Sequence, residues 1–387
     1  MLTQKVSTID ELLQFVSTLR QKHGVRLWFR GEENADLTLI PSIQRSQKRL
    51  DSERYIANDF YIRARQILDK ILACYEDVSV CDKEIDELKK FWHAKLDNFK
   101  INTPSPAFNS MVNTWNAYQC FLTFTWSRAA SFIYCGERNG YGYRDTVQDI
   151  QGVIHTDPEA ALDKIRFMLS AQVDNGGGLP LVRFDHDERA GHEGTPDDPD
   201  YVKETGHPAY RADDALWLFP TVFKYVSETG NLAFMDEEIT WSNVPEKATV
   251  YEHLQRAIDF SMNHLGPHGL PAGLHADWND CLRLGAQGES SFVAMQLYYA
   301  FSIMRLFAQK KNDTDYIAYL DKTQKEIGDK INELWWEDDR FNRGFKDTGE
   351  LIGSKKDPEA SMWLATGFSI SPFSLPLEKK VFIPKID

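Results

Sequence analysis

Apolar side chains recur at three- and four-residue spacing through most of the chain after about residue 107. This spacing is typical of helices that bury one face. Polar, glycine-rich segments separate the apolar runs, and no long alternating run typical of a strand is present. The pattern predicts helices at 107–134, 146–155, 158–173, 213–229, 249–264, 291–311 and 314–336.

The first 66 residues follow a different pattern. A periodic run at 9–22 predicts a short amphipathic helix, and two strand-like segments follow it, the second interrupted by Pro41. Two charge-rich helical runs between 52 and 99 then lead to prolines at 104 and 106, which mark a boundary. We therefore expect four segments: a small α+β domain at 1–66, linker helices at 67–104, the main helical domain at 105–364 and a tail at 365–387.

The segment between Asp174 and Ala212 has no helical periodicity and holds six Gly, four Pro and nine Asp or Glu residues. A loop of this length inside a compact domain is usually functional.

Helices that alternate with long loops are typical of an α/α toroid, a ring of inner and outer helices with a site at one mouth. No repeat of about 20–50 residues is visible, which argues against a solenoid.

Composition and charge narrow the function classes. The 387 residues are 42% hydrophobic and 26% charged, as in ordinary globular proteins, and the formal net charge is −14. A negative chain repels a phosphate backbone, so nucleic acid is not an expected partner. No run of about 18 uncharged apolar residues is present, which argues against a membrane span. Asp10 and Glu11 lie where an export signal would be apolar, and five cysteines without a CxxC pair fit a reducing cytoplasm, the expected location.

Aromatic residues are in excess, at 12% with ten Trp. Sugars present flat C–H faces that stack on aromatic rings, and several tryptophans lie in polar surroundings such as the run HADWNDC. Trp is also highly buried on average, so core filling is the alternative interpretation for each of them.

The run from His275 to Leu282 is the strongest candidate for catalysis. It places Asp277 and Asp280 three residues apart around Trp278, on a loop between two predicted helices. A carboxylic acid beside an aromatic platform suits general acid catalysis on a sugar, because a neighbouring carboxylate and an apolar wall keep such an acid protonated. The alternative is a turn built by Asp and Asn side chains, with Trp278 in the core.

Two further clusters lie where loops enter helices. The run NGYGYRDTVQD offers Arg144, Asp145, Gln148 and Asp149 to several sugar hydroxyls. The run YRADDALW offers Asp214. The alternative interpretation is the same for both, since acidic residues near a helix start are favourable without any ligand.

Other catalytic templates are missing from the sequence. It contains no GxxxxGK[ST], GxGxxG, HExxH or GxSxG motif. In the long loop, His186, His192 and His207 lie with Asp185 and Asp187, but their spacing matches no usual ligand set. We therefore expect no metal.

Eight runs, in order along the chain, form one pattern over residues 85–364: NTWNAYQC (113–120), GERNGYGYRDTVQD (136–149), QVDNGGGLPLV (172–182), DDALWLFPT (213–221), ETGN (228–231), TVYEHL (249–254), NHLGPHGLPAG (263–273) and ADWNDCLRLG (276–285). Together they resemble glycoside hydrolase family 94, the cellobiose and chitobiose phosphorylases.

This resemblance implies a fold and a chemistry. Members carry an (α/α)6-barrel-type toroid and cleave a β-linked disaccharide with inorganic phosphate, inverting the anomeric centre to give an α-sugar 1-phosphate without a cofactor. In this sequence Asp280 corresponds to the general acid and Trp278 lines the sugar site, while Arg144 and Asp149 correspond to residues that hold the donor sugar. A homodimer is the assembly common in the family. The other expected binding residues are Asp145, Asp277, Gln148 and Asp214.

The sequence departs from the family at both ends. Residues 28–31 (WFRG), with LIPS at 39–42 and Arg45, resemble the FRG domain, in a place where family 94 has a large β-sandwich. After Leu364 the family pattern ends, and the predicted helices are fewer than a closed ring needs. We therefore expect an incomplete toroid that follows a small FRG-like domain and linker helices.

Three functions remain open. The first is a disaccharide phosphorylase of cellobiose, chitobiose or cellobionate type, with its activity reduced or lost through truncation. The second is a non-catalytic FRG-domain protein that carries a phosphorylase remnant. The third is an inverting glycoside hydrolase, for which Glu289 is the candidate second carboxylate.

Overall fold

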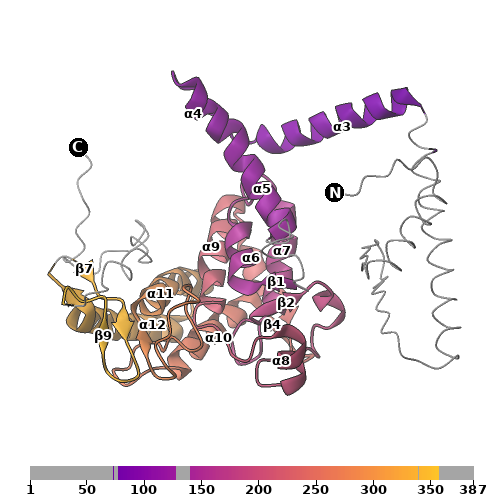
Figure 1. Ribbon diagram of the computed structural model, residues 1–387. Helices are drawn as coiled ribbons and strands as arrows, with labels where there is room; N and C mark the ends of the chain where they lie inside the picture. The colour runs from indigo at the N-terminus through magenta and orange to yellow at the C-terminus, as the bar shows by residue number, and fades with distance from the viewer. Residues whose placement is uncertain (1–72, 74–76, 128–139, 339, 357–387) are drawn as a thin grey trace, which may run out of the picture. The chain divides into compact units, whose positions relative to one another are not determined.

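A computed structural model describes residue 73 and residues 77–127, 140–338 and 340–356 (Figure 1). The chain divides into two compact units, Met1–Leu88 and Lys89–Asp387. The part of the first unit that is described consists mainly of the beginning of α3 (Val78–Leu96). The expected FRG-like segment at 1–66 and the tail at 365–387 lie outside the described residues.

The described part of the second unit is mainly helical, as the periodicity predicts. Its helices are α4 (Pro106–Ser110), the π-helical η1 (Met111–Asn116), α5 (Ala117–Trp126), α6 (Tyr143–Ile150), α7 (Pro158–Ser170), α8 (Pro199–Thr205), α9 (Leu218–Thr229), α10 (Val250–Asn263), α11 (Ser291–Lys311) and α12 (Thr314–Trp335). Short 3₁₀ turns lie between them: η3 (His186–Glu188), η4 (Ala215–Trp217) and η5 (Leu232–Asp236).

The strands are short and lie in the connections: β1 (Gly140–Gly142), β2 (Leu181–Arg183), β3 (Glu238–Thr240), β4 (Lys247–Thr249), β5 (Glu289–Ser290), β6 (Trp336–Glu337), β7 (Arg340–Phe341), β8 (Gly344–Phe345) and β9 (Leu351–Ile352). Strand β1 pairs with β2, β3 with β4 and β6 with β7, while β8 lies between β5 and β9, all antiparallel. Because β1 runs directly into α6 and β5 into α11, these short ladders fix where two helices begin.

Several predictions differ from the structure, and the helix expected at 213–229 begins as the 3₁₀ turn η4 before α9. The run at 107–134 is not one helix, since the π-helical η1 separates α4 from α5. The run expected as a helix at 146–155 is helical only at 143–150: α6 begins at Tyr143, because Gly142 is extended and ends β1, and α6 ends at Ile150. The expected loop at 174–212 contains β2, η3 and α8.

The core lies around α11. Helix α9 packs on α7 and on α11, and α11 packs on α10 and α12. By length and composition alone α11 could cross a membrane. Of its most apolar window, 61% is buried inside the fold, as in the core helix of a globular protein.

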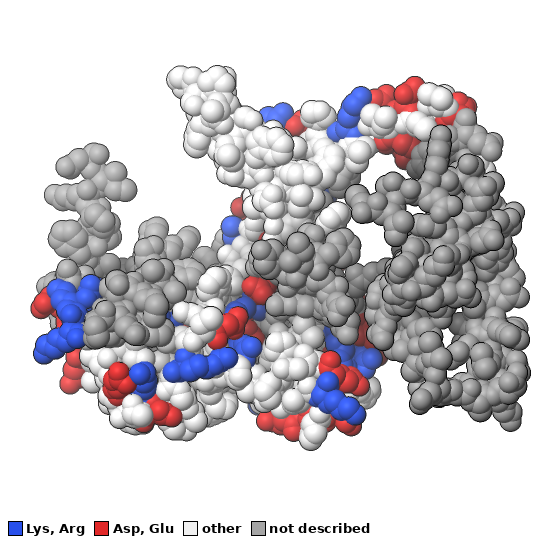
Figure 2. Space-filling view, viewed as in Figure 1, with Lys and Arg blue, Asp and Glu red and all other residues white. Residues whose placement is uncertain are grey.

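The consecutive helices α4, η1 and α5 carry no charged residue, and they form the white upper surface in Figure 2. Phe108, Met111, Trp115 and Trp126 are each more than half exposed on them. Large exposed apolar side chains of this kind are typical of a contact surface.

His253 of α10 is a buried titratable group of the core. Its Nδ1 lies 2.8 Å from Gln172 Oε1 and its Nε2 lies 3.1 Å from the carbonyl oxygen of Ile239. The ring also stacks on Trp241, with the centroids 3.8 Å apart. Burial lowers the pKa of His253 to about 4.

This buried histidine predicts a loss of stability in acid. Between about pH 6.5 and pH 4 the unfolded chain takes up a proton at His253 that the folded chain excludes, so the free energy of unfolding falls by about 3 kcal/mol as pH falls through this window. The measurement is urea unfolding at about pH 7.5 and pH 4.5, with His253→Gln as the non-titrating control. An equal pH dependence in both proteins would contradict the assignment.

Candidate active site

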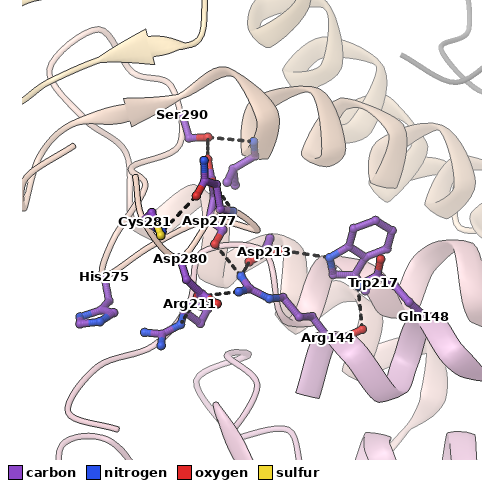
Figure 3. A network of polar contacts seen from close by, with 12 residues as sticks. Arg144, Gln148, Arg211, Asp213, Trp217, His275, Asp277, Asp280, Cys281 and Ser290 are labelled. Atoms are coloured by element: carbon purple, nitrogen blue, oxygen red, sulfur yellow. Dashed lines mark hydrogen bonds and ion pairs between the residues drawn. The ribbon is translucent and has the colours of Figure 1, made fainter. Parts of the chain in front are cut away.

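Three segments that are far apart in sequence meet in one polar network (Figure 3). They are the first turn of α6, the turn that precedes η4, and the loop between α10 and β5. The backbone N–H of Ala212 donates to the carbonyl oxygen of Ala276 at 3.1 Å, and Arg211 forms an isolated β-bridge with Leu274. These contacts bring the clusters recognised in the sequence side by side.

Arg144 is the centre of the network. Its Nη1 donates to Asp213 Oδ1 at 2.9 Å and to the carbonyl oxygen of Asp277 at 2.5 Å, and its Nη2 donates to Asp280 Oδ1 at 2.7 Å. Burial opposes its charge, but the carboxylates of Asp213, Asp214 and Asp280 outweigh burial and raise the pKa of the guanidinium. Arg144 therefore stays charged and links the acid loop, residues 274–284, to the floor of the site.

Asp213 and Asp214 form this buried floor. Asp213 also accepts a hydrogen bond from Trp217 Nε1 at 3.0 Å. Burial raises the pKa of both carboxyls, and the rise is larger for Asp214 because it also faces the negative charge of Asp213. The neighbouring pair thus divides into a charged member that holds Arg144 and a member that favours the neutral form.

Asp280 faces the solvent from above this floor. Its side chain is 64% exposed although its Oδ1 is held by Arg144 and lies 3.4 Å from Nε of Arg211. Trp278 is 46% exposed, which excludes the alternative interpretation that it fills the core. The loop therefore presents a carboxyl group and an indole ring together, as a sugar site requires.

The acid loop, residues 274–284, is built by side chains that bind its own backbone. The N–H of Asn279 donates to Asp277 Oδ1 at 2.9 Å, and the N–H of Cys281 donates to Asn279 Oδ1 at 3.0 Å. The turn expected as the alternative interpretation is therefore present, and it supports the exposed Asp280. The Asp277 side chain is only 1% exposed, so the structure gives it a supporting role in place of the expected contact with substrate.

The other binding candidates lie around α6. Gln148 donates from Nε2 to the carbonyl oxygen of Arg144 at 3.0 Å, and the Asp145 carboxylate folds back against Gly142. Asp149 lies five positions after Arg144, about 140° around the helix, and its charge acts on Cys120 of α5. The structure therefore brings Arg144, Asp214 and Asp280 together, and the charge of Asp145 acts on Asp214.

Glu289 cannot serve as the second carboxylate of a hydrolase. It is fully buried, and it accepts hydrogen bonds from the backbone N–H groups of His268 and Leu270 at 2.9 and 3.1 Å. Its Oε2 also lies 2.5 Å from Nδ1 of His268. A base that activates water needs access to that water, so the hydrolase interpretation loses its candidate.

The histidines of the long loop do not form a metal site. Among the described residues no group of three or more His, Cys, Asp or Glu side chains could hold a metal ion. His186 is buried, its Nδ1 pairs with Glu193, and its Nε2 lies 3.2 Å from Ser170 Oγ. Both ring nitrogens are therefore engaged within the protein.

Sequence reasoning missed four residues of the network. Arg211 and Asp213 lie beside Asp214 in a recognised run, but the sequence does not show which side chain of that run faces Arg144. Ser290 and Arg343, which contact Asp277, belonged to no recognised pattern. Only the folded structure shows that Ser290 and Arg343 contact Asp277.

Comparison with known proteins identifies a family and several relatives. The profile of the glycosyl hydrolase 94 superfamily, catalytic domain, matches residues 91–371. The chain is 34% identical over 310 residues to the N,N′-diacetylchitobiose phosphorylase of Vibrio furnissii, a match that covers 76% of this chain and 38% of that protein. It is 36% identical over 309 residues to the enzyme of the same name from Vibrio proteolyticus, covering 75% and 37%.

A more distant relative is also named a phosphorylase. The chain is 28% identical over 279 residues to the solabiose phosphorylase of Paenibacillus borealis, covering 70% of this chain and 32% of that protein. The chain thus spans less than two fifths of the length of each of these curated relatives.

Proposed function

The chain belongs to the glycosyl hydrolase 94 superfamily, and from this membership we propose that it cleaves a β-linked disaccharide with inorganic phosphate. The reaction inverts the anomeric centre and releases an α-sugar 1-phosphate. The helical domain would be of the (α/α)6 toroid type, and the first substrate to consider is N,N′-diacetylchitobiose, because two relatives are named for it.

Asp280 is the proposed general acid. It would give its proton to the glycosidic oxygen as the bond from that oxygen to the anomeric carbon breaks, while a phosphate oxygen bonds to the same carbon from the opposite face. The observation that carries this assignment is its position: an exposed carboxyl group fixed on Arg144 and beside Arg211. Trp278, exposed in the same loop, would stack against a sugar ring.

The two guanidinium groups suit a reaction with an anion. Arg211 keeps one buried donor, Nη1, without a hydrogen-bond partner among the described residues. A phosphate dianion drawn to this positive charge would compete with Asp280 for the guanidinium groups and leave the carboxyl free to carry a proton. Phosphate is itself the nucleophile, so one acid suffices, whereas an inverting hydrolase needs a second carboxylate about 6.5–9.5 Å away.

The test is cleavage by the full chain with and without phosphate. We expect sugar 1-phosphate from N,N′-diacetylchitobiose, cellobiose or cellobionate only when phosphate is present, with the α-anomer identified by NMR. Free sugars formed at the same rate without phosphate would indicate a hydrolase. No product from folded protein would contradict phosphorolysis by this chain and favour the non-catalytic FRG-domain hypothesis.

A further inference from the structure

Asp277 is held by two side chains that arrive from outside the acid loop. Arg343 donates from Nη2 to Asp277 Oδ2 at 2.5 Å and from Nη1 to Ser290 Oγ at 3.1 Å. Ser290 Oγ in turn donates to Asp277 Oδ2 at 2.6 Å. We call these three residues the Asp277 brace. The Arg343 side chain is only 6% exposed, so the brace is buried.

Backbone hydrogen bonds fix the position of Arg343 beside Ser290 and Asp277. Its N–H donates to the carbonyl oxygen of Ile352 at 2.8 Å, and its carbonyl oxygen accepts from the N–H and Oγ of Ser291 at 3.1 and 2.7 Å. Ser290 pairs with Gly344 between β5 and β8. At Gly344, with φ +153°, a Cβ would collide with the Glu289 carbonyl oxygen, so only glycine allows the strands to approach this closely.

The brace is connected to the proposed acid through two short paths. Asp277 Oδ1 accepts from the N–H of Asn279, which fixes the turn that leads to Asp280. The carbonyl oxygen of Asp277 accepts from Arg144, whose other donor holds Asp280. A shift of Asp277 would therefore move both supports of Asp280 at once.

The ion pair between Asp277 and Arg343 explains why position 343 is an arginine. A guanidinium is a rigid fork that reaches two acceptors at once, here a carboxylate and a hydroxyl, whereas an ammonium is a point charge. Since Asp277 and Arg343 are both buried, neither charge is compensated by water when the other is removed. The brace thus depends on both the charge and the shape of Arg343.

We propose that Arg343 is a positioning residue: resting on the proposed function, it holds Asp277 and thereby sets the position of Asp280 for proton transfer. It does not touch the reacting atoms, and it acts through Asp277. Its substitution should therefore loosen the acid loop selectively and slow the chemical step more than it weakens substrate binding.

Hydrogen exchange of the full chain tests the brace without any substrate. In Arg343→Met we expect the amides of residues 276–284 to lose at least about tenfold more protection than the amides in the middle of α11. Arg343→Lys should lie between wild type and Arg343→Met, because it keeps the charge and loses the fork. The matched control is Lys346→Met, which removes a cation from the same β8–β9 hairpin, where Lys346 pairs with the exposed Glu350 at 2.7 Å.

Two outcomes would overturn the proposal. One is wild-type exchange of residues 276–284 in Arg343→Met. The other is an equal loss of protection in α11 and in residues 276–284 in both Arg343 variants, because it would indicate a role in global stability alone. The selective pattern, with Lys346→Met unchanged, would support it.

Kinetics then test the catalytic consequence. We expect kcat of Arg343→Met to fall about tenfold while KM for the disaccharide stays within about twofold, with partial recovery in Arg343→Lys. An unchanged kcat would show that the brace does not position Asp280. If the wild-type chain makes no sugar 1-phosphate, the proposed function fails, and the exchange experiment still decides whether Arg343 holds the loop.

Discussion

Asp280→Asn should lower kcat/KM for phosphorolysis by about a thousandfold, within the range of about 10²–10⁴ typical for the loss of a general acid. Asparagine keeps nearly the same shape but has no proton to give to the leaving oxygen. Because the Asp280 side chain is 64% exposed, the free energy of unfolding should change by less than about 1 kcal/mol. Initial rates of sugar 1-phosphate formation and urea unfolding measure the two effects.

The matched control is Asp163→Asn. Asp163 also pairs with an arginine at the surface, 3.1 Å from Arg166, and its side chain is 78% exposed, but it lies on α7 outside the network. It should keep the wild-type rate. A 4-nitrophenyl glycoside should also lose less rate in Asp280→Asn, since its phenolate leaves without protonation. An Asp280→Asn rate equal to wild type would remove Asp280 from the mechanism.

Asp213→Asn should destabilise the fold by about 3–5 kcal/mol, the usual cost of removing one partner from a buried ion pair. It leaves the buried Arg144 without its closest buried carboxylate and weakens the acceptor of Trp217 Nε1. The measurement is urea unfolding beside Asp280→Asn, which removes a charge from the other end of the same guanidinium. The interpretation would be wrong if the two variants unfolded at the same urea concentration.

Asp214 adds a second step to this experiment. Without the charge of Asp213, the pKa of Asp214 should fall, because that charge is one of the causes that raise it. Asp214 would then ionise more easily and replace part of the lost compensation for Arg144. The double variant Asp213→Asn with Asp214→Asn should therefore be less stable than Asp213→Asn alone.

The helices could be predicted well where periodicity and capping agree. Asp157 accepts from the N–H of Ala160 and Pro158 follows it, so α7 begins at the position that its sequence predicts. Ser290 caps α11 in the same way. The π-helical η1 was not predicted, because its apolar residues continue the spacing of the flanking helices.

The sequence predicts the site residues that lie within one recognised motif, but not the contacts between residues of different motifs. The family that the motifs indicated is confirmed, and Arg144 and Asp280 do meet although 136 positions separate them. Which of Asp213 and Asp214 holds Arg144 depends on how the turn before η4 packs, and the sequence does not contain that information. Arg343 lies 66 positions after Asp277 and reaches it only because β8 pairs with β5.

The acid loop places exposed and buried side chains at neighbouring positions. Trp278 and Asp280 are exposed to solvent, whereas the side chain of Asp277, in the same loop, is buried. A change of side chain at position 278 can therefore alter the surface that the loop presents while leaving the Asp277 brace intact. In evolutionary terms, such a loop lets a lineage vary an exposed position by single substitutions, without first acquiring a compensating change in the core.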